Sequence, residues 1–172
     1  MAELPLGPPA IHDALLKHTG FLISRMGLVA HKQFAERMEQ LGLTTRMWGA
    51  LNVLDAEGEI TQHRLCANTG IDPSSMVATL DELEAKGLVE RRRHPNDRRA
   101  HALHLTDAGR ERLARGRKLA RIAQDELLAP LSAEEREVLH ELLLRLVYAT
   151  REVGGKATPD ATSAEPAPVA SG

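Results

Sequence analysis

One stretch of the chain, residues 71–106, constrains its fold more than any other. Its first part is predicted to be a helix, because Asp72 has the character of an N-cap residue and Pro73 suits the first helical position. Gly87 then stands where a helix commonly ends in a left-handed residue. Apolar residues spaced four and three apart form the stripe that this helix would bury: Met76, Leu80 and Leu83.

The opposite face of the predicted helix carries small side chains over its first two turns. With the apolar stripe turned inward, four residues project outward: Ser74, Ser75, Val77 and Ala78. Small side chains near a helix N-terminus let phosphates and base edges approach closely. We therefore expect these four residues to contact DNA.

A basic hairpin is predicted directly after this helix. Between residues 91 and 99 there is one acid against five arginines: Arg91, Arg92, Arg93, Arg98 and Arg99. The run PND at residues 95–97 is typical of a turn, and residues 100–105 have the pattern of a returning strand with His101, Leu103 and Leu105 on one face. A helix followed by such a hairpin indicates a winged helix-turn-helix, in which the helix enters a major groove and the wing carries arginine to the adjacent minor groove.

Three spaced motifs carry a more specific indication: LEAKGLV at residues 83–89, DRRA at residues 97–100 and LHLT at residues 103–106. With them, the sequence over about residues 15–150 resembles the MarR family, named for the multiple-antibiotic-resistance regulators. The resemblance implies that Arg99 enters the minor groove, that Asp97 orients it or a neighbour, and that Arg98 meets a phosphate. Arg91 and Arg93 lie on one face of the predicted strand and are expected to contact DNA, whereas alternation places Arg92 on the opposite face. The three arginines need not all touch DNA.

The rest of the chain predicts a mainly helical fold with a small β wing. Residues 1–10 hold three prolines and a glycine and are expected to form a flexible arm. Residues 44–105 would be the winged helix-turn-helix, and residues 154–172 are too poor in large apolar side chains to fold. Helices are predicted over residues 11–40, 44–56, 62–68, 106–128 and 132–152.

The terminal helices, within residues 11–43 and 106–153, carry more apolar surface than so small a core can cover. Interlocking of these helices between two copies would bury that surface, so a homodimer is expected, and MarR-like proteins are built this way. The resemblance further implies a ligand cleft between the dimer part and the DNA-binding part. There His18, Arg25 and Trp48 would meet a small anionic or phenolic effector.

The charge distribution and the cysteine content indicate what the protein binds and in which compartment it acts. The net charge is −2, but residues 88–118 hold ten Lys or Arg against four acids, which is the footprint of a DNA-binding surface on an acidic protein. A single cysteine excludes an intrachain disulfide and suggests a reducing compartment. The sequence has no signal-peptide pattern and no apolar run long enough for a bilayer, so we expect a cytoplasmic protein without membrane contact.

The sequence thus predicts a transcriptional regulator of double-stranded DNA with a pseudo-palindromic operator, most simply a repressor released by its ligand. It holds no motif of a hydrolase, nucleotide-binding or metalloprotease site, so no enzyme and no cofactor are expected. The eight histidines show no metal-site spacing. Two alternatives remain open at this stage, a redox sensor using Cys66 and a winged-helix module for protein contacts.

Overall fold

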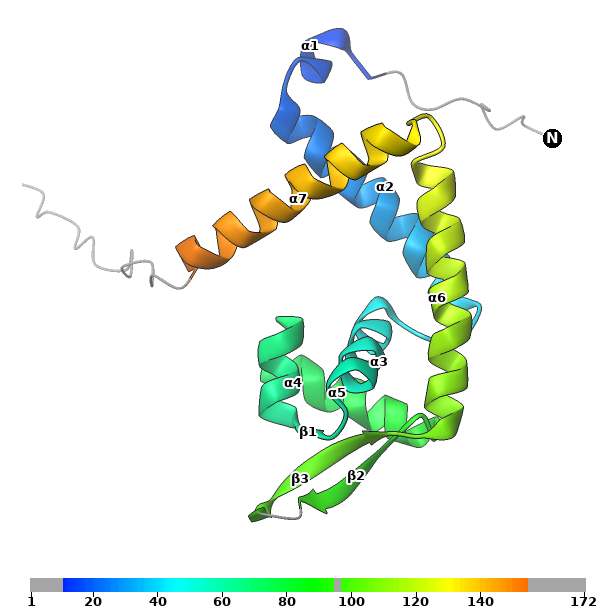
Figure 1. Cartoon of the computed structure of the whole chain (residues 1–172), viewed down its shortest axis with the longest axis vertical. Coiled ribbons are helices and arrows are strands. Elements are labelled where there is room, and N and C mark those ends of the chain that lie inside the picture. Colours follow the sequence, from blue (N-terminus) through cyan, green and yellow to red (C-terminus); the bar gives the residue numbers. More distant parts are fainter. Residues whose placement is uncertain (1–10, 95–96, 155–172) are drawn as a thin grey trace, which may run out of the picture. The chain divides into compact units, whose positions relative to one another are not determined.

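A computed structural model describes residues 11–94 and 97–154, with backbone alone for residues 93–94, 97–101 and 150–154 (Figure 1). The predicted arm, most of the predicted tail and the turn at residues 95–96 lie outside the described residues. The chain divides into two compact units, one up to Leu127 and one from Leu128 onward.

The first unit contains all the predicted elements of the winged helix-turn-helix, and the mainly helical fold with a small sheet is confirmed. Its helices and strands are α1 (Asp13–Leu16), α2 (Thr19–Glu39), α3 (Thr45–Glu57), β1 (Ile60–Thr61), α4 (Gln62–Thr69), α5 (Pro73–Ala85), β2 (Val89–His94), β3 (Asp97–Leu105) and α6 (Asp107–Leu127). The second unit contains α7 (Ala133–Gly154). No helix among the described residues is both long and apolar enough to cross a bilayer.

Local capping chemistry explains where the helices of the DNA-binding part begin and end. The hydroxyls of Thr44 and Thr61 accept backbone N–H groups at the starts of α3 and α4, and Asp72 does so at the start of α5. Gly70 ends α4 in the left-handed conformation, and Gly87 follows α5 with φ +68°. These boundaries confirm the sequence prediction to within one or two residues.

The prediction of the first helix is wrong in one respect, because the structure has two helices there. Instead of one helix over residues 11–40, the short α1 ends at Leu16, and His18 adopts an extended conformation as the N-cap of α2. Thr19 and Gly20 follow the break, and both are poor helix formers. The chain therefore loses little helical stability by leaving the helix there, which apolar periodicity alone does not reveal.

The small sheet has three antiparallel strands in the order β1-β3-β2. Val89 pairs with Leu105 across the hairpin, and the register is irregular between Arg93 and His94. On the other edge of β3, Ile60 pairs with Leu103. The sequence did not predict β1, because two residues are too short for any period to appear.

One aliphatic core joins the helices of the first unit to the sheet. Its fully buried members come from α2 through α6 and include Met38, Leu51, Leu65, Leu80, Leu103 and Leu113. The predicted stripe of α5 is buried there in full. Phe34 and Trp48 are half-buried at the margin of this core. Residues of α5 and of both hairpin strands belong to this core, so α5 and the hairpin pack on the same set of buried side chains.

Polar contacts fasten α6 to the helices beside it. The guanidinium of Arg117 lies 2.8 Å from the carboxylate of Asp55 and donates to the side chain of Asn52, both on α3. Arg112 donates to the carbonyl of Leu41, and Arg37 on α2 pairs with Glu126. The helix that leaves the hairpin is therefore bonded to both α2 and α3.

A capping box lies at the start of α7 in the second unit. The Ser132 N–H donates to the Glu135 carboxylate at 2.8 Å, and the Glu135 N–H donates to the Ser132 hydroxyl at 3.3 Å. Along α7, large apolar side chains are exposed, among them Val138, Leu142, Leu143, Leu146 and Tyr148. Within one chain these apolar side chains of α7 are thus left in contact with solvent.

Candidate nucleic-acid interface

The start of α5 is shaped by the carboxylate of Asp72. Its Oδ1 accepts the backbone N–H of Ser75 at 2.9 Å and the hydroxyl of Ser74 at 2.6 Å. The hydrogen bonds from Ser74 and Ser75 hold the pKa of Asp72 well below its usual range. Asp72 is therefore ionised at neutral pH and stabilises the positive end of the helix.

The outward face of α5 has the predicted composition. Ser74, Val77 and Ala78 are exposed, and the exposed fraction of Val77 is 43%. Ser75 is half-buried, and its carbonyl accepts the hydroxyl of the buried Thr79 at 2.8 Å. The first two turns of α5 therefore present a shallow surface without long side chains.

The hairpin of β2 and β3 follows α5 after the turn at Gly87, in the same unit (Figure 1). The backbones of four predicted contact residues lie on its strands: Arg93, Asp97, Arg98 and Arg99. Their side chains lie outside the part of the chain that the structure describes. The placement of the strands agrees with a wing, and the contacts of these four side chains stay predictions.

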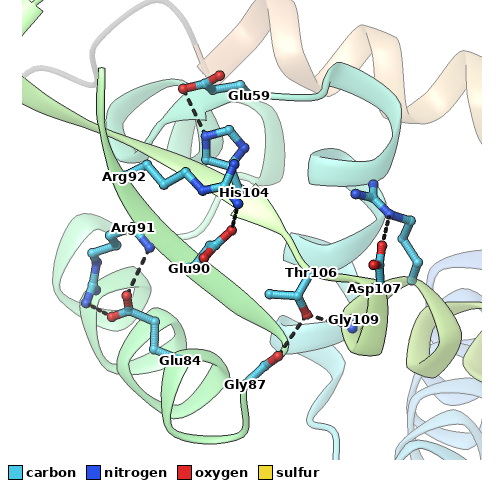
Figure 2. A network of polar contacts seen from close by, with 11 residues as sticks. Glu59, Glu84, Gly87, Glu90, Arg91, Arg92, His104, Thr106, Asp107 and Gly109 are labelled. Atoms are coloured by element: carbon cyan, nitrogen blue, oxygen red, sulfur yellow. Dashed lines mark hydrogen bonds and ion pairs between the residues drawn. The ribbon is translucent and has the colours of Figure 1, made fainter. Parts of the chain in front are cut away.

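Arg91 has a setting that the sequence did not predict (Figure 2). Its guanidinium pairs with Glu84 and lies 2.8 Å from the carboxylate of Asp81, and its backbone N–H donates to Glu84 at 3.0 Å. The exposed fraction of the Arg91 side chain is only 26%. Arg91 therefore ties β2 to α5 in this structure.

The sequence did not predict that two acids on α5, Asp81 and Glu84, would pair with Arg91. Asp81 and Glu84 are three residues apart, a spacing that places them on one helix face. A pair of acids facing a following strand rich in arginine was a usable signal. Arg92, by contrast, pairs with Glu90 on its own strand, on the opposite face from Arg91 as alternation predicts.

A second junction joins the wing to α6 (Figure 2). The Thr106 hydroxyl donates to the carbonyl of Gly87 at 2.8 Å and accepts the backbone N–H of Gly109 at 3.0 Å. The Thr106 N–H donates to the carbonyl of Leu88 at 3.1 Å. The turn after α5, the end of β3 and the start of α6 are thus held together by one capping residue, and Nε2 of His104 adds a contact of 3.0 Å to Glu59 beside β1.

Trp48 lies where α2, α3 and α6 meet. Its ring stands edge-on to Phe34, with centroids 5.0 Å apart and planes at 77°. A Cβ built on Gly116 of α6 would lie 3.0 Å from Cδ1 of the indole, so α6 passes very close to this ring. The indole N–H is buried and makes no hydrogen bond to any residue of the described chain.

The other two residues predicted to bind the ligand lie toward the N-terminal end of α2. His18 is exposed at the N-cap, and Arg25 is half-buried. Sixteen residues separate His18 from Phe34, the α2 residue that touches Trp48, and this is about 24 Å along a helix. The corresponding separation for Arg25 is about 14 Å. The structure does not bring His18 and Trp48 together within one chain.

Cys66 is half-buried on α4 and packs against the aliphatic core as a free thiol. That setting is typical of a small buried apolar residue. Among the side chains that the structure describes, no three from His, Cys, Asp and Glu gather as metal ligands would.

Comparisons with known proteins agree with this geometry. The sequence profile of the MarR family matches residues 41–100. A relative from Thauera aromatica, the transcriptional regulatory protein assigned to its hcr operon, is 34% identical over 137 residues. That match covers 79% of this chain and 82% of the relative.

Two solved structures with bound DNA are similar in fold. CouR, a transcriptional repressor bound to a 23-mer DNA duplex, is 33% identical with a TM-score of 0.73, over 85% of this chain and 99% of CouR. A cysteine-to-serine variant of MarR from E. coli, in complex with operator DNA, is 27% identical with a TM-score of 0.67. That match covers 74% of this chain and 91% of the MarR variant.

Proposed function

This chain belongs to the MarR family of transcriptional regulators, which are not enzymes, and on that premise we propose that it is a cytoplasmic, homodimeric repressor of double-stranded DNA. One observation carries the proposal. The exposed N-terminal face of α5 and an arginine-rich hairpin belong to one compact unit, in the order that a winged helix-turn-helix requires. The solved relatives with bound DNA support the same reading.

In this proposal α5 enters the major groove and the hairpin reaches the adjacent minor groove. Arg99 reads the minor groove, Asp97 orients it or a neighbour, and Arg98 and Arg93 meet phosphates. Arg91 acts differently from the other arginines, because its pairing with Asp81 and Glu84 holds β2 against α5. We assign it the task of positioning the wing relative to the recognition helix.

The homodimer is supported by exposed apolar side chains near both ends of the described chain. On α1 and α2 these include Leu15, Leu16, Ile23, Met26 and Leu28. On α7 they include Val138, Leu142 and Leu146. Burying such side chains between two copies stabilises the pair by the hydrophobic effect. A pseudo-palindromic operator then needs half-sites about 34 Å apart, one turn of DNA.

The DNA-binding proposal is tested by titrating operator DNA with three variants at one salt concentration. Arg99→Ala should lower specific affinity strongly, and Arg98→Ala should weaken binding to all sequences alike and reduce the salt dependence. Each loss should correspond to about 1–3 kcal/mol. Arg121→Ala, an exposed arginine on α6, is the matched control and should bind almost normally. Wild-type affinity in Arg99→Ala would remove the assigned role of the wing.

Repression should be released by a small anionic or phenolic ligand that binds beside Trp48. The buried indole N–H makes no hydrogen bond within the described chain, so an acceptor oxygen on a ligand would satisfy it. The site touches α2, α3 and α6, which connect the helix-turn-helix to the proposed dimer helices. A ligand that prefers one spacing of the two recognition helices would shift DNA binding by its differential affinity.

Two titrations test this part of the proposal, one of ligand and one of ligand with saturating operator DNA. Linkage requires that operator DNA weakens ligand binding by the same factor by which ligand weakens operator binding. Arg25→Ala should lower ligand affinity. His18 lies about 24 Å along α2 from the residue that touches Trp48. The variant His18→Ala therefore distinguishes a ligand site near Trp48 from a ligand site near the N-cap of α2. A larger loss in His18→Ala than in Arg25→Ala would move the site to that end.

A further inference from the structure

We propose that Val77 reads the C5-methyl group of thymine in the major groove, so that each half-site of the operator carries a thymine opposite this residue. The inference rests on the proposed DNA-binding function and adds the chemistry of base recognition to it. It follows from the side chains that α5 presents to a base and from the side chains that α5 lacks.

The recognition helix lacks every side chain that donates bidentate hydrogen bonds to a base edge. Its sequence, PSSMVATLDELEA, contains no Arg, Lys, Asn, Gln or His. Bidentate contacts from Arg or Lys to guanine, and from Asn or Gln to adenine, are the usual direct readout in the major groove. Base discrimination by α5 therefore has to come from hydroxyls, carboxylates or apolar groups.

The hydroxyls and carboxylates are largely engaged within the protein. The Ser74 hydroxyl donates to Asp72, and Ser75 is half-buried. Asp81 and Glu84 are paired with Arg91. The exposed Glu82 lies in the second half of the helix, whereas the N-terminal residues of a recognition helix contact base edges. These polar groups are poorly placed to select a base.

The apolar group is well placed. Val77 is the fifth residue of α5, and 43% of its surface is exposed, while its neighbour Ala78 adds only one methyl group. Val77, Asp81 and Glu84 are spaced four and three apart, so Val77 lies on the face that turns toward the hairpin. Thymine is the base that presents a methyl group in the major groove. Contact between that methyl and the Val77 isopropyl group would remove both from water.

The test begins with selection of binding sites for the full-length protein from a random pool of duplex DNA. Each thymine of the selected site is then replaced singly by deoxyuridine, which removes the methyl group and leaves the hydrogen-bonding edge unchanged. Loss of one buried methyl should weaken wild-type binding about fourfold at one position of a half-site. Deoxyuridine in the flanking DNA should have no effect.

Variants assign the effect to the residue. Val77→Ala changes an exposed residue of a helix, so the variant should still fold. It should bind the thymine duplex and the duplex with deoxyuridine at the sensitive base position equally well. Ile122→Ala shortens an exposed β-branched residue of α6 with the same exposed fraction, 43%, and should keep the wild-type ratio of affinities for thymine and deoxyuridine duplexes. The inference would be overturned if the wild type bound thymine and deoxyuridine duplexes equally well at every position. It would also be overturned if Val77→Ala preferred thymine as strongly as the wild type does. If the wild type selects no sequence at all, the DNA-binding function itself fails.

Discussion

The guanidinium of Arg91 on β2 lies 2.8 Å from the carboxylate of Asp81 on α5, and the same guanidinium also pairs with Glu84. The helix proposed to enter the major groove is thus bonded to the hairpin proposed to enter the minor groove. In the proposed complex both elements meet DNA at the same time, and these ion pairs already give them a defined mutual orientation in the free protein. Such preorganisation lowers the ordering cost of binding.

The first prediction follows from this contact. Arg91→Ala should lower the free energy of unfolding by about 1 kcal/mol, because one partner, Asp81, is 59% exposed and its pairing is screened by water. It should also weaken operator binding, since the hairpin loses its tether to α5. Arg92→Ala is the matched control, because Arg92 is itself 59% exposed and, among the side chains that the structure describes, pairs with Glu90 on its own strand. Urea unfolding and operator titration measure both effects, and equal behaviour of the two variants would argue against the positioning role.

The second prediction concerns the close packing of Gly109. A Cβ at this position would overlap the carbonyl oxygen of Leu88 and the side chain of Leu105. Gly109→Ala should therefore destabilise the protein by about 1–3 kcal/mol, as overpacking does, although Ala is the better helix former.

Gly49→Ala on α3 is the control for Gly109→Ala. Nothing lies within 4 Å of a Cβ at Gly49, and this residue does not have a positive φ. The substitution should leave the protein unchanged or stabilise it by about 0.5–1 kcal/mol. In thermal unfolding, the midpoint temperature should fall in Gly109→Ala. In Gly49→Ala it should rise or stay as in the wild type. Equal midpoints would contradict the packing argument.

The third prediction uses Trp48 as a reporter, since it is the single tryptophan of the chain. A Cβ at Gly116 would lie 3.0 Å from Cδ1 and 3.2 Å from Nε1 of the indole, so Gly116→Ala must displace the ring or α6. The emission spectrum of Trp48 should shift, and ligand binding beside the indole should weaken. Gly27→Ala on α2, with open space around its Cβ, should leave the spectrum as in the wild type. An unshifted spectrum in Gly116→Ala would mean that the close approach is absent in solution.

The fourth prediction concerns acid. Hydrogen bonds from Ser74 and Ser75 lower the pKa of Asp72 below its ordinary value of 3.8. A lowered pKa in the folded state means that the stabilisation is complete above that ordinary value and is lost as the pH falls through the folded pKa. Asp72→Asn keeps an N-cap acceptor but cannot ionise. The wild type should be more stable at neutral pH, and the difference from Asp72→Asn should narrow below about pH 4. A difference independent of pH would show that ionisation contributes nothing.

Much of the fold follows from short-range chemistry that can be seen in the sequence. The caps at Thr44, Thr61 and Asp72 and the stop at Gly87 depend on residues within one turn of each other, so their side chains alone predict them. The same holds for the small outward face of α5, because helical spacing decides which residues oppose a buried stripe. The break before α2 was missed because weak helix formers permit an interruption without requiring one.

The sequence by itself determined the helix α5, the hairpin of β2 and β3 and their order along the chain, because each depends on neighbours in the sequence. The DNA contacts that the sequence predicts for these elements stay predictions. Only the tertiary structure decided that Arg91 is bound to Asp81 and Glu84, that β1 completes the sheet, and that α6 passes close to Trp48. Each of these depends on residues that meet through packing, after the core has set the distance and angle between whole elements. Side-chain type predicts which residues an arginine can pair with, and the fold determines which of these residues lies within hydrogen-bond distance.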